Sequence, residues 1–160
     1  MGNPQVSLVI CTRNRVARLK RCLQYVAKQR PSCTWELVVV DNGSSDETRA
    51  VLTEYVAGVP FSARVVQEPA PGVGRAKNAG WAASRGEIIA FTDDDCYIAP
   101  DYIDRVWKAF CNNTEVGFAG GRVDLFDPMD FPLTINTSAE LAFLKPRTNF
   151  TIGPIVGANM

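Results

Sequence analysis

The chain has 160 residues, of which 46% are hydrophobic and 21% charged, and its 17 Lys and Arg residues balance its 17 Asp and Glu residues. This length and composition are typical of a single globular domain that can bury a core. The balanced charge gives no overall field that would attract nucleic acid or an anionic membrane, so we expect neither as a primary partner. Histidine is absent, which excludes imidazole triads and leaves carboxylate, Lys, Tyr or Cys as a general base.

Cysteine usage indicates a reducing compartment. The five cysteines are odd in number and widely spaced, with no C-x-x-C pair, which argues against a zinc site and a secreted disulfide framework. The first apolar run is only about seven residues long, too short for a signal sequence or a membrane span. We therefore expect a cytoplasmic protein with no membrane segment in this chain. Any association with the inner face of a membrane would come from residues beyond Met160.

Secondary structure is predicted by two kinds of pattern. Short apolar, β-branched runs predict buried strands, and apolar residues recurring every three or four positions predict amphipathic helices. In chain order the predicted elements are strand 6–11, helix 15–29, strand 35–40, a helix capped by Ser45 or Asp46 and ending at Gly58, strand 62–67, helix 75–84, strand 87–91 and helix 101–110.

This alternation of strands and helices predicts an α/β fold, with a mostly parallel sheet flanked by helices on both faces. Beyond the last of these helices the pattern predicts a strand at 122–126, a short helix at 137–144 and a strand or loop at 150–156. No linker or repeat divides the chain, so residues 1–160 are predicted to form one domain.

Three consecutive carboxylates, Asp93, Asp94 and Asp95, follow the predicted strand 87–91. Such closely spaced carboxylates repel one another and raise each other's pKa, so a cation or abundant water is needed to keep them ionised. Oxygen ligands of this kind suit Mg²⁺ or Mn²⁺. The alternative is a solvated acidic turn that caps the helix at 101–110.

Polar clusters at 12–14, 41–44 and 93–95 each follow a predicted strand. The carboxyl ends of parallel strands share one edge of a sheet, where ligands bind, so we expect the three clusters to meet in one crevice. Asp41 could accept a hydrogen bond from a nucleotide ring or ribose, or it could close an Asx turn.

Gly72 and Gly74 precede a predicted helix that carries Arg75 and Lys77. A phosphate could bind at such a helix N-terminus, and the two basic residues could meet a pyrophosphate, although basic residues on a helix face are more often solvated. The dinucleotide and P-loop fingerprints are both incomplete here.

Taken together, these residues resemble family-2 glycosyltransferases of the GT-A (nucleotide-diphospho-sugar transferase) fold. The resemblance runs over essentially the whole chain, and five segments carry it in order. They are residues 7–15, 38–46, 72–80, 91–95 and 156–160.

The resemblance implies a D-x-D motif at Asp93 and Asp95, with Asp95 touching Mn²⁺ or Mg²⁺ and Asp93 or Asp94 contacting ribose or metal-bound water. The other implied contacts with the nucleotide-sugar donor are Thr12 and Asp41 at the base, and Asn14, Arg75 and Asn78 in support of the donor. The implied reaction is metal-assisted, inverting transfer of a sugar from a UDP- or GDP-sugar to a glycan or lipid-linked acceptor. Polysaccharide assembly is its implied setting.

The family's catalytic base lies downstream of the segment that matches 156–160, so we expect it beyond Met160 and assign no base in this chain. Our hypothesis is a truncated protein that holds the donor-binding half and the start of the acceptor half. The remaining carboxylates Asp124, Asp127, Asp130 and Glu140 are poor replacements.

Three alternatives remain open. A catalytically silent nucleotide-binding fragment would bind a nucleoside diphosphate without turnover. A sugar nucleotidyltransferase shares the sheet and the metal carboxylate, but its glycine-rich opening after the first strand is missing here. A domain whose Asp triplet only caps a helix would show no effect of metal.

Overall fold

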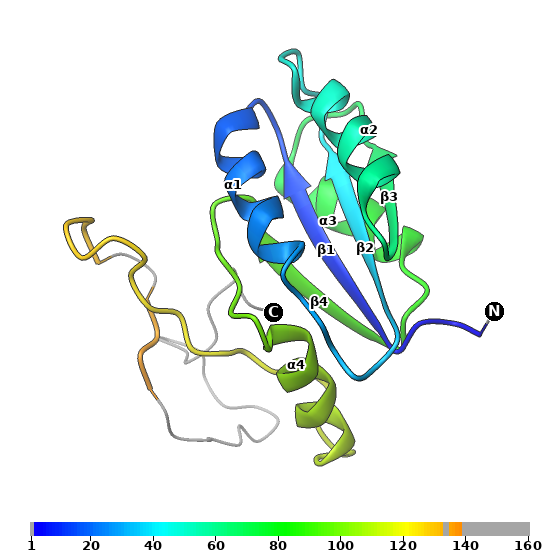
Figure 1. Cartoon of the computed structure of the whole chain (residues 1–160), viewed down its shortest axis with the longest axis vertical. Coiled ribbons are helices and arrows are strands. Elements are labelled where there is room, and N and C mark those ends of the chain that lie inside the picture. Colours follow the sequence, from blue (N-terminus) through cyan, green and yellow to red (C-terminus); the bar gives the residue numbers. More distant parts are fainter. Residues whose placement is uncertain (1, 133–134, 139–160) are drawn as a thin grey trace.

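The computed structural model describes residues 2–132 and 135–138. Four parallel strands form one sheet (Figure 1) in the order β3-β2-β1-β4. The strands are β1 (Val6–Thr12), β2 (Trp35–Asp41), β3 (Ser62–Gln67) and β4 (Ile88–Asp93). The predicted α/β class with a parallel sheet is confirmed.

Four helices connect and cover the strands. They are α1 (Val16–Val26), α2 (Thr48–Gly58), α3 (Val73–Ala83) and α4 (Tyr102–Cys111). In Figure 1, α1 and α2 lie over one face of the sheet and α3 over the other. The first layer of the core therefore packs the β1 and β2 side chains against α1, α2 and α4, and the second packs them against α3.

Residues along β1 alternate between these two layers. Leu8 and Ile10 belong to the layer beneath α1, whereas Val9 packs toward Ala76 of α3. Because both faces are covered, β1 and β2 are apolar over nearly their whole length, as buried parallel strands require. Gly80 lets α3 approach the sheet closely, since a Cβ at that position would lie 2.4 Å from Val9 Cγ1.

The order of the strands creates a switch point between β1 and β4. The chain builds outward from β1 through β2 to β3, then returns to place β4 on the other side of β1. Ligands of open α/β sheets bind in the crevice at such a point, beyond the carboxyl ends of the strands. Thr12 is in register with Asp41, and Cys11 with Asp93, so these ends are level and the predicted convergence is present.

Some element bounds differ from those predicted. Helix α1 ends at Val26 rather than 29, and the backbone then tightens, because the Lys28 amide bonds to the Tyr25 carbonyl and the Gln29 amide to the Val26 carbonyl. Strand β4 extends through Asp93, so the first carboxylate of the triplet is itself a strand residue.

The predicted strand at 122–126 is wrong. Its alternating pattern meets only an isolated antiparallel bridge between Val123 and Asn136, and one bridge is too little to form a ladder. The predicted helix at 137–144 falls almost wholly outside the described residues, and the element at 150–156 falls wholly outside them. No helix within the described part of the chain has the length and apolar character needed to cross a bilayer.

Candidate functional site

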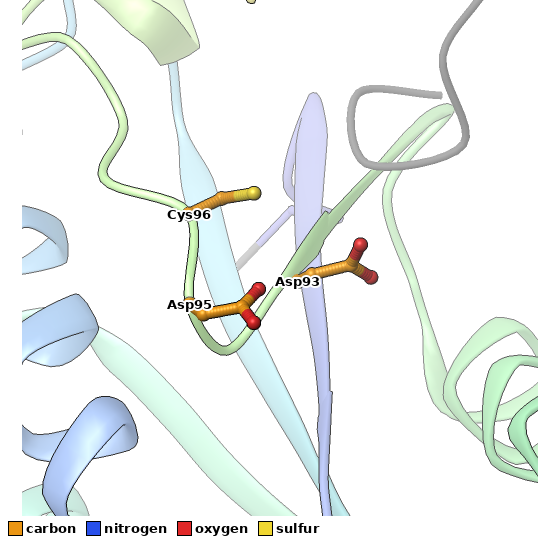
Figure 2. Close-up of side chains that lie close together, drawn as sticks. All are labelled: Asp93, Asp95 and Cys96. Atoms are coloured by element: carbon orange, nitrogen blue, oxygen red, sulfur yellow. The ribbon is translucent and has the colours of Figure 1, made fainter. Parts of the chain in front are cut away.

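The acidic loop after β4 brings two carboxylates and a thiol together. Figure 2 shows Asp93 at the end of the β4 ribbon and Asp95 and Cys96 on the loop that follows. The Cys96 amide donates to the Asp93 carbonyl at 3.1 Å, which closes the turn. One ligand atom from each of the three side chains lies within 4.8 Å of the other two. All three residues are half-buried, so the cluster stays open to solvent on one side.

The electrostatics at Asp93 favour a nearby cation. Desolvation raises the pKa of Asp93; Lys77 and Arg15 oppose this rise, and the Asp95 and Asp94 charges add to it. Burial also raises the pKa of the Cys96 thiol, which keeps it protonated at neutral pH and leaves the carboxylates as the charged ligands. Two carboxylate oxygens that crowd one another are a ligand set suited to a hard divalent ion. The residues present therefore fit Mg²⁺ or Mn²⁺.

Asp94 differs from its two neighbours because it is enclosed. Its side chain is 4% exposed. The Thr12 hydroxyl donates to Asp94 Oδ2 at 2.7 Å, and Arg15 donates to Oδ1 at 3.1 Å. Thr12, which the sequence placed beside the nucleotide base, thus gives its hydroxyl to Asp94 in this structure.

Two arginines that the sequence did not single out contact Asp95. Both Arg15 and Arg18 donate to Asp95 Oδ2, at 3.2 and 3.1 Å. They stand three residues apart around the first turn of α1, on one side of the helix. Such spacing directly after a strand end is the sequence feature that could have identified them.

Asp41 lies at the end of β2, and its side chain bonds to the backbone of the following turn three residues on, rather than two residues on as in the Asx turn that was the alternative to a nucleotide contact. It is buried, and its Oδ1 accepts the Ser44 amide at 3.0 Å. Beside it, buried Asn42 donates to the carbonyls of Glu68 and Ala70 and accepts from the Gly72 amide at 2.8 Å. Sequence reasoning missed Asn42, which fixes the segment before α3 to the end of β2.

Asn14 connects the loops after β1 and β2. Its φ of 52° lies in the left-handed region, which asparagine tolerates better than most residues. Its amide donates to Ser44 Oγ at 3.0 Å, and its side-chain oxygen accepts the Ser45 amide at 2.7 Å. Asn14 therefore lies at the predicted edge and joins two of the three clusters.

Arg75 and Asn78 lie on α3, on the other side of the sheet from α1, and both are exposed. Neither side chain forms a hydrogen bond or ion pair with the described residues. The structure thus brings Thr12, Asn14, Asp41 and the Asp triplet to one edge, with Arg75 at the start of α3 beside them.

Comparison with known proteins gives the family of this fold and site. Residues 7–156 match the family model described as glycosyl transferase family 2. The glycosyltransferase AglE of Haloferax volcanii is 30% identical over 126 residues, which are 78% of this chain and 41% of AglE.

Solved structures that are similar to this chain support the same family. The mannosyltransferase PcManGT from Pyrobaculum calidifontis, in complex with GDP-Man and Mn²⁺, superposes with a TM-score of 0.60 at 27% identity, over 68% of this chain and 33% of that one. TarS 1–349 of S. aureus, in complex with UDP-GlcNAc, gives 0.59 at 26% identity, over 69% and 32%. The chain thus spans less than half the length of these relatives. With a matching family model over most of its length and a GT-A-like sheet, the chain belongs to glycosyl transferase family 2.

Proposed function

We propose that this protein transfers a sugar from a nucleotide-diphosphate donor to an acceptor, and that the described residues bind the donor. The observation that carries the proposal is the convergence of the Asp93 and Asp95 carboxylates at the switch point between β1 and β4. That GDP-Man and Mn²⁺ occur in one similar structure and UDP-GlcNAc in another supports it. A UDP- or GDP-sugar is therefore the proposed donor.

Asp93 and Asp95 would hold the divalent ion, Mn²⁺ or Mg²⁺. When bound there, such an ion neutralises charge on the diphosphate as it leaves the sugar. Asp41 and Thr12, at the ends of β2 and β1, would border the nucleotide base. Asn14 keeps the loops after these strands together through its bonds to Ser44 and Ser45.

The start of α3 would face the phosphates. Asn42 holds the Gly72 amide, which fixes where the helix begins, and the first turn of a helix presents free amides and a positive dipole end to an anion. Arg75 adds a guanidinium in that turn, and Asn78 follows one turn later. These two residues would support the donor from the side of the sheet opposite α1.

Residues 1–160 are proposed as one GT-A domain that contains the donor-binding half and the start of the acceptor half. Inverting transfer to a glycan or lipid-linked acceptor is the proposed reaction of the whole protein, and we assign no catalytic base among the described residues. A catalytically silent nucleotide-binding unit is the second candidate, because the described residues are assigned to the donor site and none of them is assigned as the catalytic base. The family match favours the transferase over the sugar nucleotidyltransferase.

The test is calorimetric titration of UDP and then GDP, with and without Mn²⁺. We expect metal-dependent binding to the chain, loss of that binding in Asp95→Ala, and unchanged binding in the control Asp130→Ala, which removes an exposed carboxylate far along the chain. A folded chain that binds neither nucleotide, or an Asp95→Ala variant that binds normally, would contradict the proposal. Assay of sugar transfer against donor hydrolysis then separates the enzyme from the silent binding unit.

A further inference from the structure

We propose that Thr12, Asp94 and Arg15 form a brace that positions Asp95 and Asp93 for the metal, and that Asp94 is a positioning residue rather than a ligand. The inference rests on the proposed donor-binding function, which it deepens. The brace joins three elements that meet at the switch point: the end of β1, the start of α1 and the loop after β4.

Both carboxylate oxygens of Asp94 accept hydrogen bonds from the protein. Oδ2 accepts from Thr12 at 2.7 Å and Oδ1 from Arg15 at 3.1 Å, while the side chain is almost fully enclosed. A buried carboxylate is costly unless charged or hydroxyl groups compensate it, and hydrogen bonds to an ionised group are stronger than neutral ones. Thr12 and Arg15 supply that compensation, so the backbone of the acidic loop is fixed at its middle residue.

Arg15 connects Asp94 to Asp95. The same nitrogen, Nη1, lies 3.1 Å from Asp94 Oδ1 and 3.2 Å from Asp95 Oδ2. The Arg15 side chain is half exposed, and an exposed arginine would by itself hold Asp95 weakly. Because the enclosed Asp94 anchors the guanidinium, the carboxylate of Asp95 is oriented as well. Arg18 contacts Asp95 from outside and is exposed itself, so we assign it no part in the brace.

The proposed roles of the three carboxylates, two as metal ligands and one as a positioning residue, follow from where they lie. Asp93 and Asp95 are half-buried and share a cluster of ligand atoms with Cys96, whereas Asp94 lies among protein donors. Groups that orient metal ligands are worth about 10- to 100-fold in metal affinity when removed. We therefore expect Thr12, which would not touch the metal, to matter for metal affinity through Asp94.

The test measures the affinity for Mn²⁺ alone, by electron paramagnetic resonance, and for Mn²⁺ with UDP or GDP, by calorimetry. We expect Thr12→Val and Asp94→Asn each to weaken Mn²⁺ binding about tenfold, and Thr12→Ser, which keeps the hydroxyl, to bind as the parent does. The double variant Thr12→Val, Asp94→Asn should bind no more weakly than Asp94→Asn alone, because the two residues act through one contact.

Ser7→Ala is the matched control. Ser7 donates a hydroxyl to the buried carboxylate of Glu36, also at 2.7 Å, but at the opposite edge of the sheet. Its loss should lower the unfolding temperature as much as Thr12→Val does, with no change in Mn²⁺ affinity. If Asp94→Asn does not fold, the contrast of Thr12→Val with Thr12→Ser and Ser7→Ala decides the question alone.

Three results would overturn the brace. The first is an Asp94→Asn variant that loses Mn²⁺ as completely as Asp95→Ala while Thr12→Val binds normally, because Asp94 would then be a ligand. The second is normal Mn²⁺ affinity in both Thr12→Val and Asp94→Asn. The third is a folded parent chain without Mn²⁺ affinity, which overturns the donor-site proposal as well. A parent that binds Mn²⁺ but no nucleotide defeats only the proposed function, and the variants still test the brace on Mn²⁺ alone.

Discussion

Carboxylates and arginines meet at both edges of the sheet, but they have different surroundings at the two edges. At the amino edge, Glu36 is buried and accepts from both Arg64 terminal nitrogens, from the Ser7 hydroxyl and from the Arg85 amide. At the carboxyl edge, Asp93 and Asp95 lie half-buried beside a third carboxylate. Both edges bring carboxylates and arginines into contact, Glu36 with Arg64 at one and Asp95 with Arg15 at the other. Composition is therefore not what distinguishes Glu36 from Asp93 and Asp95: Glu36 is fully enclosed and multiply bonded, whereas Asp93 and Asp95 are half-buried.

The pKa directions of the two edges are opposite. Desolvation alone would raise the pKa of Glu36, but the bonds from Arg64, Ser7 and Arg85 outweigh it and lower the pKa below its ordinary value of 4.5. For Asp93 desolvation wins, and the neighbouring carboxylates add to the rise. A carboxylate that the protein already stabilises is structural. One that the protein destabilises is available to a cation, which is the pattern of functional sites.

The largest expected effect is at the amino edge. Arg64→Met would leave the buried Glu36 charge without its main partner, and would also remove the Arg64 bond to the Ala83 carbonyl. We expect a loss of about 3 kcal/mol in the free energy of unfolding, measured by urea denaturation. Arg85→Met is the control, because Arg85 contacts Glu36 only through its backbone amide and its side chain is exposed. A loss below about 1 kcal/mol in Arg64→Met would end the distinction between the edges.

Acid unfolding should report the same carboxylate. Because the folded pKa of Glu36 is lowered, its contribution to stability is present above its unfolded pKa of about 4.5 and is lost as pH falls through the lower folded value. Glu36→Gln removes this contribution, so stability should depend less steeply on pH below about 4.5. Glu54→Gln, which alters an exposed carboxylate of α2, should keep the parent slope. Equal slopes in all three proteins would contradict the assignment.

Neutralising a carboxylate at the carboxyl edge should not lower the free energy of unfolding, unlike the loss of Arg64 at the amino edge. Asp93→Asn removes a charge that burial disfavours, so we expect the free energy of unfolding to stay constant or to rise by up to about 0.5 kcal/mol. Mn²⁺-dependent binding of UDP or GDP should be lost in this variant. A marked loss of stability, measured by urea denaturation as above, would show that Asp93 is structural as Glu36 is.

The smallest effect is expected for Arg18, the exposed arginine of α1 that contacts the acidic loop. The Arg18 side chain is 61% exposed and that of Asp95 is 36% exposed, and such pairs contribute little. Arg18→Gln should therefore change the free energy of unfolding by less than about 0.5 kcal/mol. Arg105→Gln breaks an exposed pair with Asp101 and serves as a comparison. A loss in Arg18→Gln well above that in Arg105→Gln would place Arg18 in the brace.

The strands, the helices and the meeting of three strand ends could be predicted because their causes are local. Alternation along β1 and β2 and the three-to-four spacing in α1 are read from a few neighbouring residues. The end of each strand then follows from where the apolar run stops. The strand predicted at 122–126 shows the limit of this reasoning, because alternation alone supplies no partner strand.

Contacts within the site could not be predicted in the same way. Thr12 and Asp94 are 82 residues apart, and no local pattern pairs them. The three carboxylates look equivalent in the sequence, yet one turn of the chain encloses Asp94 and leaves Asp93 and Asp95 at the open side. For Asp41, the residues were compatible with a nucleotide contact and more readily with an Asx turn, and the structure shows a bond to the Ser44 amide, three residues on. The roles of these residues toward a ligand remain predictions.

The strand order also bears on how the chain acquires its site during folding. Strand β4 pairs with β1 only after the chain has passed through β2 and β3, so closing this contact requires a long loop to be ordered first. Contacts of such large sequence separation form slowly. A nascent chain on the ribosome that has not yet emerged past Asp95 can pair β1, β2 and β3, but it lacks Ile98 and Ile103 of the larger core cluster and the bond from the Cys96 amide that closes the acidic loop. Ligands of the proposed donor site would therefore stabilise the finished domain and would not guide its early folding.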